Sequence, residues 1–292
     1  MMKKISVIIV TYNSLKDIFD CIKSIYNYND ISKEQLEIII VDNSKANVFE
    51  EMKMLVSEKY SDIKFIHNEK NGGYGQGNNI GIKASQSETV CVINPDVVLK
   101  TAMFSSVLNM FQNDLNLAVI GGKQKGGINL SFWIRPEYEF FLFTSPVMML
   151  LNKMNIYIER FCFLSGALLF IDKKKFEKIG FFDENIFLYR EESDIQKRFL
   201  AEKYRSRFEK KFNYLHLIDD RNGTSDFSFI EEMKSTKYYM KKYSYDFSKF
   251  LAQRSFYTTV MIGIYSIIGN NKKIRSLKET QKKLKNLRIE LL

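Results

Sequence analysis

The sequence contains little cysteine, proline or histidine. Its 292 residues include three prolines, three cysteines and two histidines. Cys21, Cys91 and Cys162 are an odd number at wide spacing, which fits neither a disulfide framework nor a zinc site. We therefore expect three reduced thiols in a protein of the cytoplasm.

The sequence also lacks a recognisable signal peptide and any apolar run long enough to cross a bilayer. Lys3 and Lys4 precede the apolar residues 5–10, but this run is short and β-branched, and no small-residue cleavage site follows it. The longest other apolar stretches, 140–151 and 256–268, are shorter than the ~20 residues that a spanning helix needs. We expect no spanning segment, although either stretch is apolar enough to touch a membrane face.

The formal net charge of +10 is concentrated near the carboxyl end. Residues 272–292 hold eight lysines and arginines against two glutamates. Apolar residues recur near helical spacing in this segment: Ile274, Leu277, Leu284, Leu287 and Leu291. The pattern predicts a basic amphipathic helix, which suits an anionic membrane surface. The alternative is a solvated terminal helix that packs one apolar stripe on the body of the protein.

Strand and helix patterns alternate through the first part of the chain. Continuous apolar runs predict strands at residues 5–10, 36–41, 63–67 and 89–93. Helical spacing of apolar residues predicts helices at 17–26 and 49–60. This order is typical of an α/β fold with a mostly parallel sheet and helices on both faces.

The second part of the chain is less regular. Residues 163–171 predict another strand, interrupted at Ser165 and Gly166, and residues 176–212 carry an acidic cluster followed by an expected basic helix. From about residue 225 the pattern is helical. We expect a catalytic domain at 1–225 and a basic helical extension at 226–292 that contacts a membrane surface or another subunit.

Polar residues follow three of the predicted strands where each one ends. Thr11 and Asn13 follow the first strand, Asp42 the second, and Asn94 and Asp96 the fourth. In open α/β sheets ligands bind beyond the carboxyl ends of the strands, so we expect these residues to line a site. Ordinary turn chemistry explains any one position, but explains the whole set less well.

Residues 71–79 are rich in glycine and lead into a predicted helix. Glycines let the backbone approach a ligand closely, and a helix N-terminus favours anions. No Gly-Lys-Ser/Thr follows, so this is not a Walker loop. The first strand is not followed by Gly-x-Gly-x-x-Gly either, which disfavours a classical dinucleotide fold.

A second group of acids lies near residue 192. Glu191, Glu192 and Asp194 stand within a few positions of Arg198. Carboxylates held close together raise one another's pKa, which suits a general base. Acids that complement a helix N-terminus and pair with bases one turn away are the alternative. His216 is a candidate metal or phosphate ligand, although a lone histidine is more often structural.

The order of these motifs resembles the family 2 glycosyltransferases, and within them a rhamnosyltransferase-like branch. The resemblance rests on Val7–Ser14, Ile40–Ser44, Asn71–Gly75, Asn94–Asp96, Leu164–Ala167, Gly180–Glu184 and Phe187–Asp194. It extends from about residue 5 to about residue 225. It implies the GT-A fold of nucleotide-diphospho-sugar transferases, which is a Rossmann-like sheet flanked by helices.

The resemblance also implies roles for particular residues. Donor-binding residues would be Thr11, Tyr12, Asn13, Asp42, Asn71, Gly72, Gly73, Tyr74, Asn78, Asn94, Asp96 and Arg198. A divalent cation, Mg²⁺ or Mn²⁺, would bind Asp96 and His216. Glu192 would be the catalytic base, with Glu191 or Asp194 as alternatives. Asn94 replaces the first acid of the family's metal motif, and Glu192 stands where aspartate is usual.

The resemblance implies an inverting transfer of a sugar from a UDP- or dTDP-sugar to a hydroxyl of a saccharide acceptor. With the basic tail, it favours a lipid-linked acceptor at the inner face of the cell membrane, in cell-surface polysaccharide synthesis. A non-catalytic nucleotide-sugar binder and a nucleotidyltransferase are alternatives. A nucleic-acid-binding protein would also be basic, but here the basic charge lies in the tail, so we expect no nucleic-acid partner.

Overall fold

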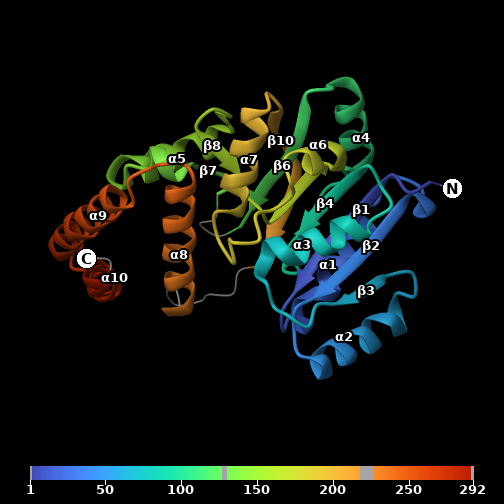
Figure 1. The fold of residues 1–292 in the computed structure, drawn as a ribbon, viewed down its shortest axis with the longest axis horizontal. Helices are drawn as coiled ribbons and strands as arrows, with labels where there is room; N and C mark the ends of the chain where they lie inside the picture. The colour runs from blue at the N-terminus through green and yellow to red at the C-terminus, as the bar shows by residue number, and fades with distance from the viewer. Residues whose placement is uncertain (1, 127–129, 218–225, 291–292) are drawn as a thin grey trace.

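The structure is a computed structural model that describes residues 2–126, 130–217 and 226–290 (Figure 1). Within these residues one eight-stranded sheet has the order β3-β2-β1-β4-β9-β6-β10-β5. Its strands are β1 (Ile5–Thr11), β2 (Leu36–Asp42), β3 (Lys64–His67), β4 (Thr89–Ile93), β5 (Val97–Leu99), β6 (Leu117–Lys125), β9 (Leu168–Asp172) and β10 (Arg205–His216). A separate antiparallel pair contains β7 (Phe132–Ile134) and β8 (Cys162–Leu164).

The first half of the sheet is parallel, as the sequence predicts. β1 lies between β2 and β4 and is parallel to both, and β2 is parallel to β3. These strands are apolar along most of their length because helices cover the sheet on both sides. The register pairs Thr11 with Asp42, so the residues at the ends of β1 and β2 meet at one edge.

Side chains that alternate along β1 enter two separate cores. Val7 and Ile9 pack with the helices α1 (Leu15–Asn27), α2 (Ala46–Lys59) and α4 (Phe104–Asn113). Ile8 packs on the opposite side with α3 (Gly73–Ala84), α6 (Lys173–Lys178) and α7 (Glu191–Ala201). The α/β fold with helices on both faces is therefore confirmed.

The second half of the sheet is mixed. β9 is antiparallel to both β4 and β6, and β5 is antiparallel to β10. The predicted strand at 163–171 is two strands, β8 and β9, which belong to different sheets. The expected basic helix ends at Ala201, and the basic residues from Arg205 onward form the strand β10.

The glycine-rich segment also differs from its prediction. Helix α3 begins at Gly73, so most of the glycines lie inside the helix and not in a loop. A Cβ at Gly77 would lie 2.7 Å from the Val10 side chain, and one at Gly81 would lie 2.4 Å from the Ile8 side chain. These two glycines therefore allow α3 to lie close against the sheet.

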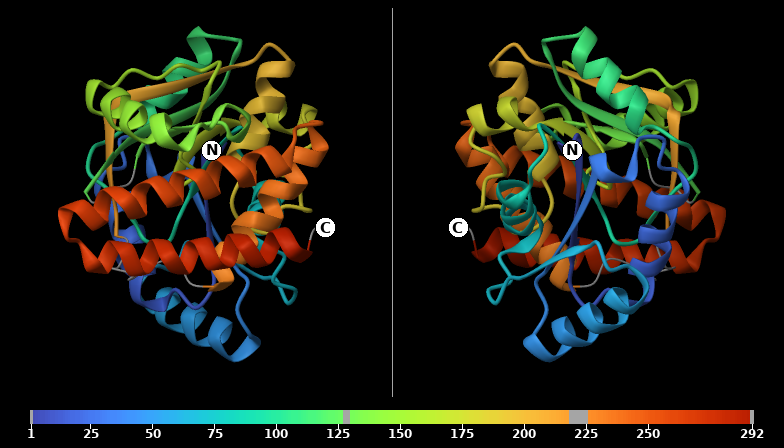
Figure 2. Two further views of the ribbon diagram at one scale, coloured as in Figure 1. Left: turned by 90° about the vertical axis from the view of Figure 1, so that its left-hand side faces the viewer. Right: turned by 90° about the vertical axis from the view of Figure 1, so that its right-hand side faces the viewer.

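Helices form the carboxyl-terminal region, as predicted. They are α8 (Asp226–Lys242), α9 (Phe247–Ile268) and α10 (Asn271–Glu290). α9 and α10 lie side by side on the far side of α8 from the sheet (Figures 1 and 2). Helix α5 (Phe141–Met154) packs on α9, where the rings of Phe141 and Phe250 are 5.1 Å apart. The expected domain boundary at residue 225 falls at the end of 218–225, which lie outside the described residues.

Among the described residues no helix is both long enough and apolar enough to cross a bilayer.

Candidate active site

The expected polar residues collect at the edge where β1, β2 and β4 end. The sheet order places these three strands side by side. The Thr11 hydroxyl donates to Oδ1 of Asp42 over 3.0 Å. Asn94 and Asp96 follow β4, and His216 ends β10. The fold thus brings together positions that lie up to about two hundred residues apart in the sequence.

Asp42 is held through one of its two carboxylate oxygens. Its Oδ1 accepts hydrogen bonds from the Thr11 hydroxyl, the Ser44 hydroxyl at 2.8 Å and the Ser44 backbone N–H at 3.2 Å. Its Oδ2 is buried and has no hydrogen-bond partner among the described residues. A buried unpaired carboxylate oxygen is costly, and an N–H group of a ligand would satisfy it.

The two residues after Thr11 shape the rim of this site. Asn13 has a φ of +53°, in the left-handed region that asparagine tolerates better than most residues. Its backbone N–H donates to the Ser44 hydroxyl over 2.8 Å. Tyr12 is exposed. An exposed aromatic ring at the end of a strand is free to stack on a planar ligand group.

Close contacts hold the first residues of α3 in place. Oδ1 of Asn71 accepts from the backbone N–H of Gly73 at 3.1 Å. The backbone N–H of Tyr74 donates to the carbonyl of Phe187 at 3.1 Å. Gly73 has a φ of +86°, and a Cβ there would lie 1.9 Å from that same carbonyl oxygen. Only glycine fits at this position, and Gly72 lies directly beside it as the residue before α3.

Tyr74 and Asn78 lie further along α3 and make contacts in the interior of the protein. The Tyr74 hydroxyl donates to the carbonyl of Gly166 at 2.7 Å, and burial raises the pKa of the phenol well above its usual value. The Asn78 amide donates to the backbone carbonyl of Tyr74, while its Oδ1 is buried without a partner in the described part of the chain. α3 therefore connects the edge where β1 and β2 end with the Gly166 turn.

Asp96 and His216 are in direct contact. Nε2 of His216 lies 3.1 Å from Oδ1 of Asp96 and 3.4 Å from the side-chain nitrogen of Asn94. No group of three or more His, Cys, Asp or Glu side chains with metal-ligand geometry occurs among residues 2–126, 130–217 and 226–290. A carboxylate and an imidazole fit a divalent cation whose remaining ligands come from substrate oxygens and water.

The acidic cluster divides into two parts with different surroundings. Asp194 is completely buried and paired: Oδ2 accepts from Arg198 at 2.7 and 2.8 Å, and Oδ1 from Lys242 at 2.6 Å and Tyr243 at 2.7 Å. Arg198 also donates to the backbone carbonyls of Ile179 and Phe181. These contacts assign Asp194 and Arg198 to holding the 179–194 segment against α8. We expected a catalytic and a donor-binding role for them, and neither role has support in this geometry.

Glu191 and Glu192 begin α7. Glu191 is buried, and its Oε1 has no partner among the described residues. Burial, with the neighbouring Glu192 carboxylate, raises the pKa of Glu191 well above its ordinary value. Glu192 is partly exposed, and burial of its carboxyl group raises its pKa as well. Its Oε1 accepts from the backbone N–H of Gly166 at 3.2 Å.

Glycine at position 166 makes the approach of Glu192 possible. A Cβ there would lie 2.2 Å from Oε1 of Glu192. The Gly166 turn is fixed from α7 as well, because Oε1 of Gln196 accepts from the backbone N–H of Leu164 at 2.8 Å. Of the three acids in the cluster, Glu192 alone combines partial exposure with a raised pKa.

Several supporting residues were not predicted from the sequence. Ser44 fixes Asp42 and Asn13, and its place directly after Asp42-Asn43 was a usable signal. The side-chain amide of Asn79 makes two hydrogen bonds to the backbone of Phe182. Its oxygen accepts from the N–H at 3.0 Å, and its nitrogen donates to the carbonyl at 2.9 Å. Lys242 bridges Asp183 and Asp194 from α8, and no local pattern announces it.

Comparisons with known proteins support the resemblance seen in the sequence. The model of the family described as "Glycosyl transferase family 2" matches residues 6–194. The chain is 29% identical, over 201 residues, to the low-salt glycan biosynthesis hexosyltransferase Agl10 of Haloferax volcanii, covering 67% of this chain and 61% of that relative. It is 27% identical over 165 residues to the poly(ribitol-phosphate) beta-N-acetylglucosaminyltransferase TarS of Staphylococcus aureus, covering 53% of this chain and 28% of that protein.

One solved structure is similar over nearly the whole chain. It is the mannosyltransferase PcManGT from Pyrobaculum calidifontis in complex with GDP-Man and Mn²⁺. The TM-score is 0.61 at 12% sequence identity, and the match covers 99% of this chain and 87% of that one. At this identity the likeness shows the fold alone, and it confirms the expected GT-A fold.

Proposed function

The chain belongs to glycosyl transferase family 2, and on this premise we propose that it is an inverting glycosyltransferase. Its donor is a UDP- or dTDP-sugar, and its acceptor is a hydroxyl of a lipid-linked saccharide in cell-surface polysaccharide synthesis. The names of the two relatives, one from glycan biosynthesis and one a poly(ribitol-phosphate) transferase, support a place in the synthesis of glycans or related polymers.

The unpaired Oδ2 of Asp42 is the observation that carries the donor assignment. Uracil and thymine each offer one ring N–H, which would donate to this oxygen and remove the cost of burying it. Thr11 and Ser44 hold the other oxygen, so the carboxylate is oriented before a nucleotide arrives. Tyr12, Asn13, Asn71, Gly72, Gly73, Tyr74 and Asn78 complete the proposed donor site, with Asn94 and Asp96 at its diphosphate end.

Asp96 and His216 would hold a divalent cation, Mg²⁺ or Mn²⁺, together with the donor's diphosphate. When bound, the cation supplies positive charge that stabilises the leaving nucleoside diphosphate. The Mn²⁺ in the mannosyltransferase complex supports use of a divalent cation.

Glu192 is the proposed catalytic base. Its carboxylate takes the proton of the acceptor hydroxyl as that oxygen bonds to the anomeric carbon, while the bond from this carbon to the diphosphate oxygen breaks. The incoming oxygen attacks from the face opposite the leaving group, so one displacement inverts the carbon. Burial raises the pKa of Glu192, so this pKa lies nearer to neutral pH than that of an exposed glutamate, which suits a general base.

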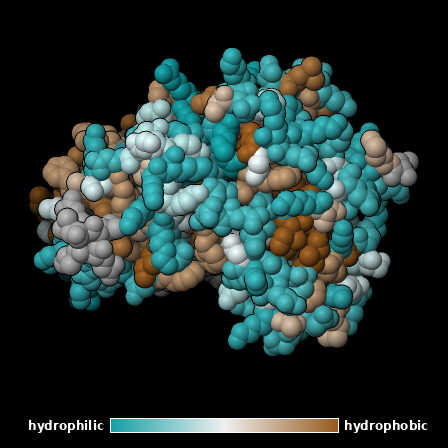
Figure 3. Space-filling model, in the orientation of Figure 1, coloured by the Kyte–Doolittle hydropathy of each residue, from teal (hydrophilic) through white to brown (hydrophobic). Residues whose placement is uncertain are grey.

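The lipid-linked acceptor requires contact with the membrane at the inner face of the cell membrane. Large apolar side chains are exposed on α5 and α9, namely Phe143, Val147, Met149, Leu150, Phe256, Ile264, Ile267 and Ile268. We call this set the apolar face. Figure 3 shows apolar surface at the end of the molecule formed by α9, beside hydrophilic residues. α10, which packs along α9, carries basic residues that suit anionic headgroups.

Calorimetric titration with UDP-, dTDP- and GDP-sugars, each with and without Mn²⁺ or Mg²⁺, tests the donor assignment. We expect metal-dependent binding of a uridine or thymidine donor, lost in Asp42→Ala and weakened in Asp96→Ala. Asp20→Ala, an exposed aspartate on α1, is the matched control and should bind as the wild type does. Equal binding by Asp42→Ala would refute the donor site. Donor binding without turnover on any acceptor would instead favour the non-catalytic binder.

A further inference from the structure

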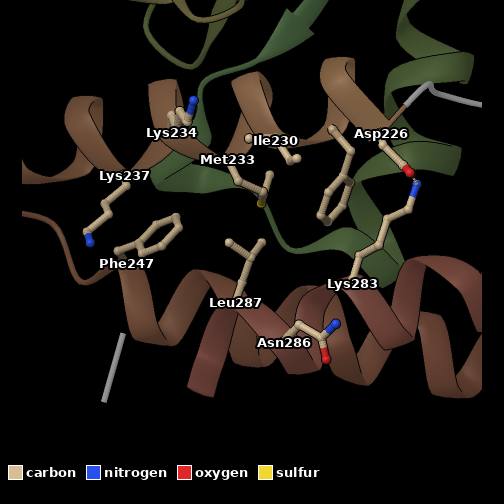
Figure 4. A pocket seen from close by; sticks show the side chains of 10 residues that line it. Asp226, Ile230, Met233, Lys234, Lys237, Phe247, Lys283, Asn286 and Leu287 are labelled. Carbon is tan, nitrogen blue, oxygen red and sulfur yellow. Dashed lines mark ion pairs between the residues drawn. The ribbon is translucent and has the colours of Figure 1, made fainter. Parts of the chain in front are cut away.

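A cavity lies between α8 and α10, away from the edge where β1, β2 and β4 end. Its volume is about 520 Å³, within the range of ~300–1,000 Å³ that is typical of small-molecule sites. Figure 4 shows apolar side chains of both helices, and Phe247 at the start of α9, pointing into it. These apolar lining residues are Phe229, Ile230, Met233, Phe247 and Leu287.

Cations surround this apolar interior. Lys234, Lys237 and Lys283 line the cavity, against one acid, Asp226. Lys283 is paired with Asp226 at 2.5 Å, and Lys234 with Glu231 at 2.7 Å. Lys237 is exposed, and no ion pair is recorded for it among the described residues. A site with apolar walls and an available ammonium group at its mouth matches a ligand with an apolar chain and an anionic head.

We propose that this cavity binds one chain and the phosphate head of an anionic membrane lipid. The inference rests on the membrane contact proposed above, because α9 carries much of the apolar face and packs between α5 and α10. The acyl chain of the lipid lies among the apolar residues of α8 and α10, and the phosphate of the lipid lies at Lys237. The cavity is therefore a lipid site separate from the donor site, on the other side of α8.

Helix α8 relates this cavity to the active site. Residues 229, 230, 233 and 237 of α8 line the cavity. From the same helix, the Ser235 hydroxyl donates to the carbonyl of Leu188 at 2.7 Å, and Lys242 bonds to Asp194. A ligand in the cavity thus contacts the helix that holds the segment leading into α7 and Glu192.

Titration of the full chain with decyl phosphate below its micelle concentration tests the proposal without a membrane. We expect saturable binding of decyl phosphate, and at least tenfold weaker binding of both decyl maltoside, which lacks the charge, and inorganic phosphate, which lacks the chain. Shortening the chain to octyl and hexyl phosphate should weaken binding about fourfold per methylene that leaves the cavity. Equal affinity for decyl maltoside, or no dependence on chain length, would overturn the proposal.

Paired variants locate the site. Lys237→Glu should weaken decyl phosphate binding at least tenfold, whereas Lys241→Glu, on the same helix but outside the cavity, should leave it unchanged. Ile230→Glu should also weaken decyl phosphate binding at least tenfold. Ile267→Glu, which changes an exposed isoleucine of α9, should leave that binding unchanged. Thermal unfolding checks that each variant is folded. Because Lys237 is exposed, we expect Lys237→Glu to fold, so the test does not depend on the Ile230 variant.

The outcomes separate this proposal from the proposed function. Loss of vesicle binding in Ile267→Glu with decyl phosphate binding retained would support both the cavity and the membrane contact. Decyl phosphate binding by a wild-type chain that does not bind vesicles would retain the cavity and refute the membrane contact. No binding of decyl phosphate by a chain that binds a nucleotide sugar would refute the cavity alone.

Discussion

Two adjacent glutamates at the start of α7 have raised pKa values but different surroundings. Glu191 is 2% exposed and has one carboxylate oxygen without a partner among the described residues, whereas Glu192 is partly exposed and accepts a bond from Gly166. A base must meet its substrate, so access favours Glu192. A buried carboxylate oxygen that has no partner among the described residues makes Glu191 a cost to the fold.

We predict that Glu192→Gln lowers kcat by at least ~10²-fold while donor affinity stays within about twofold, because the amide cannot accept the acceptor proton. The wild-type rate should fall as the pH decreases through the raised pKa, with a midpoint above the ordinary glutamate value of 4.5. Steady-state kinetics against pH, with calorimetry of donor binding, measure both. Retained turnover in Glu192→Gln would remove Glu192 from the mechanism.

Glu191→Gln is expected to keep activity and to raise stability at neutral pH. A carboxyl group whose folded-state pKa is raised binds a proton more tightly when folded, so its unfavourable contribution grows as pH rises above the unfolded value near 4.5. The gain should be on the order of 1 kcal/mol, roughly 2–4 °C in Tm, and should disappear below that pH. Thermal melts at several pH values test this, and a gain that does not depend on pH would contradict the explanation.

At the scale of elements, the candidate active site depends on a few close contacts. The first residues of α3 meet the carbonyl of Phe187, and the Gly166 turn meets Glu192. In both places a glycine stands where any Cβ would collide. α3, α7 and the turn between β8 and β9 are thereby held in one arrangement.

Gly73→Ala and Gly180→Ala form a matched pair that tests this. Both glycines have φ near +85°, but a Cβ at Gly73 would meet Phe187, while one at Gly180 would meet nothing within 4 Å. Gly180→Ala should cost about 1–2 kcal/mol from backbone strain alone, and Gly73→Ala at least twice as much, with donor binding lost. Equal unfolding free energies for the two variants would show that the close contact does not matter.

The sequence predicted these elements where one strong pattern decided them. The apolar runs of β1, β2 and β4 and the polar residues after them were sufficient to predict the parallel half of the sheet and the edge at which those polar residues collect. The split of residues 163–171 into β8 and β9 was missed because both strands are apolar, and pairing partners are not visible in a single sequence.

The partners of Asp194 show which contacts of the candidate site a sequence does not predict. Charge spacing in α7 correctly suggests the i,i+4 pair with Arg198. Lys242, the last residue of α8, and Tyr243, which follows it, lie 48 and 49 residues later, and both donate hydrogen bonds to Asp194. Contacts at such separation depend on the packing of α8, which no local pattern determines.

At the scale of the whole molecule, the sheet lies at one end, and α5, α9 and α10 form the other (Figure 1). The apolar face and the basic helix α10 therefore occupy the same end of the protein. This arrangement would give the proposed membrane contact both an apolar and an electrostatic component.

Binding to vesicles of neutral and anionic phospholipids tests that contact. We expect binding that increases with the anionic fraction and weakens as salt screens the charges. Ile267→Glu should reduce it about tenfold or more, because burying a large aliphatic side chain contributes roughly 1.5–3 kcal/mol. Leu115→Glu, whose leucine is 81% exposed between α4 and β6, is the control. An equal loss in both variants would show that the apolar face has no special part in binding.

The buried thiols have a practical consequence for such measurements. Cys21, Cys91 and Cys162 are all buried and unpaired, and burial raises the pKa of each thiol, so the reactive thiolate is scarce and shielded from reagents. A single cysteine introduced at an exposed position of α9 or α10 would then be the one site that takes up a maleimide dye. The native protein can therefore be labelled with a fluorescent dye at one introduced cysteine, without first replacing its own three cysteines.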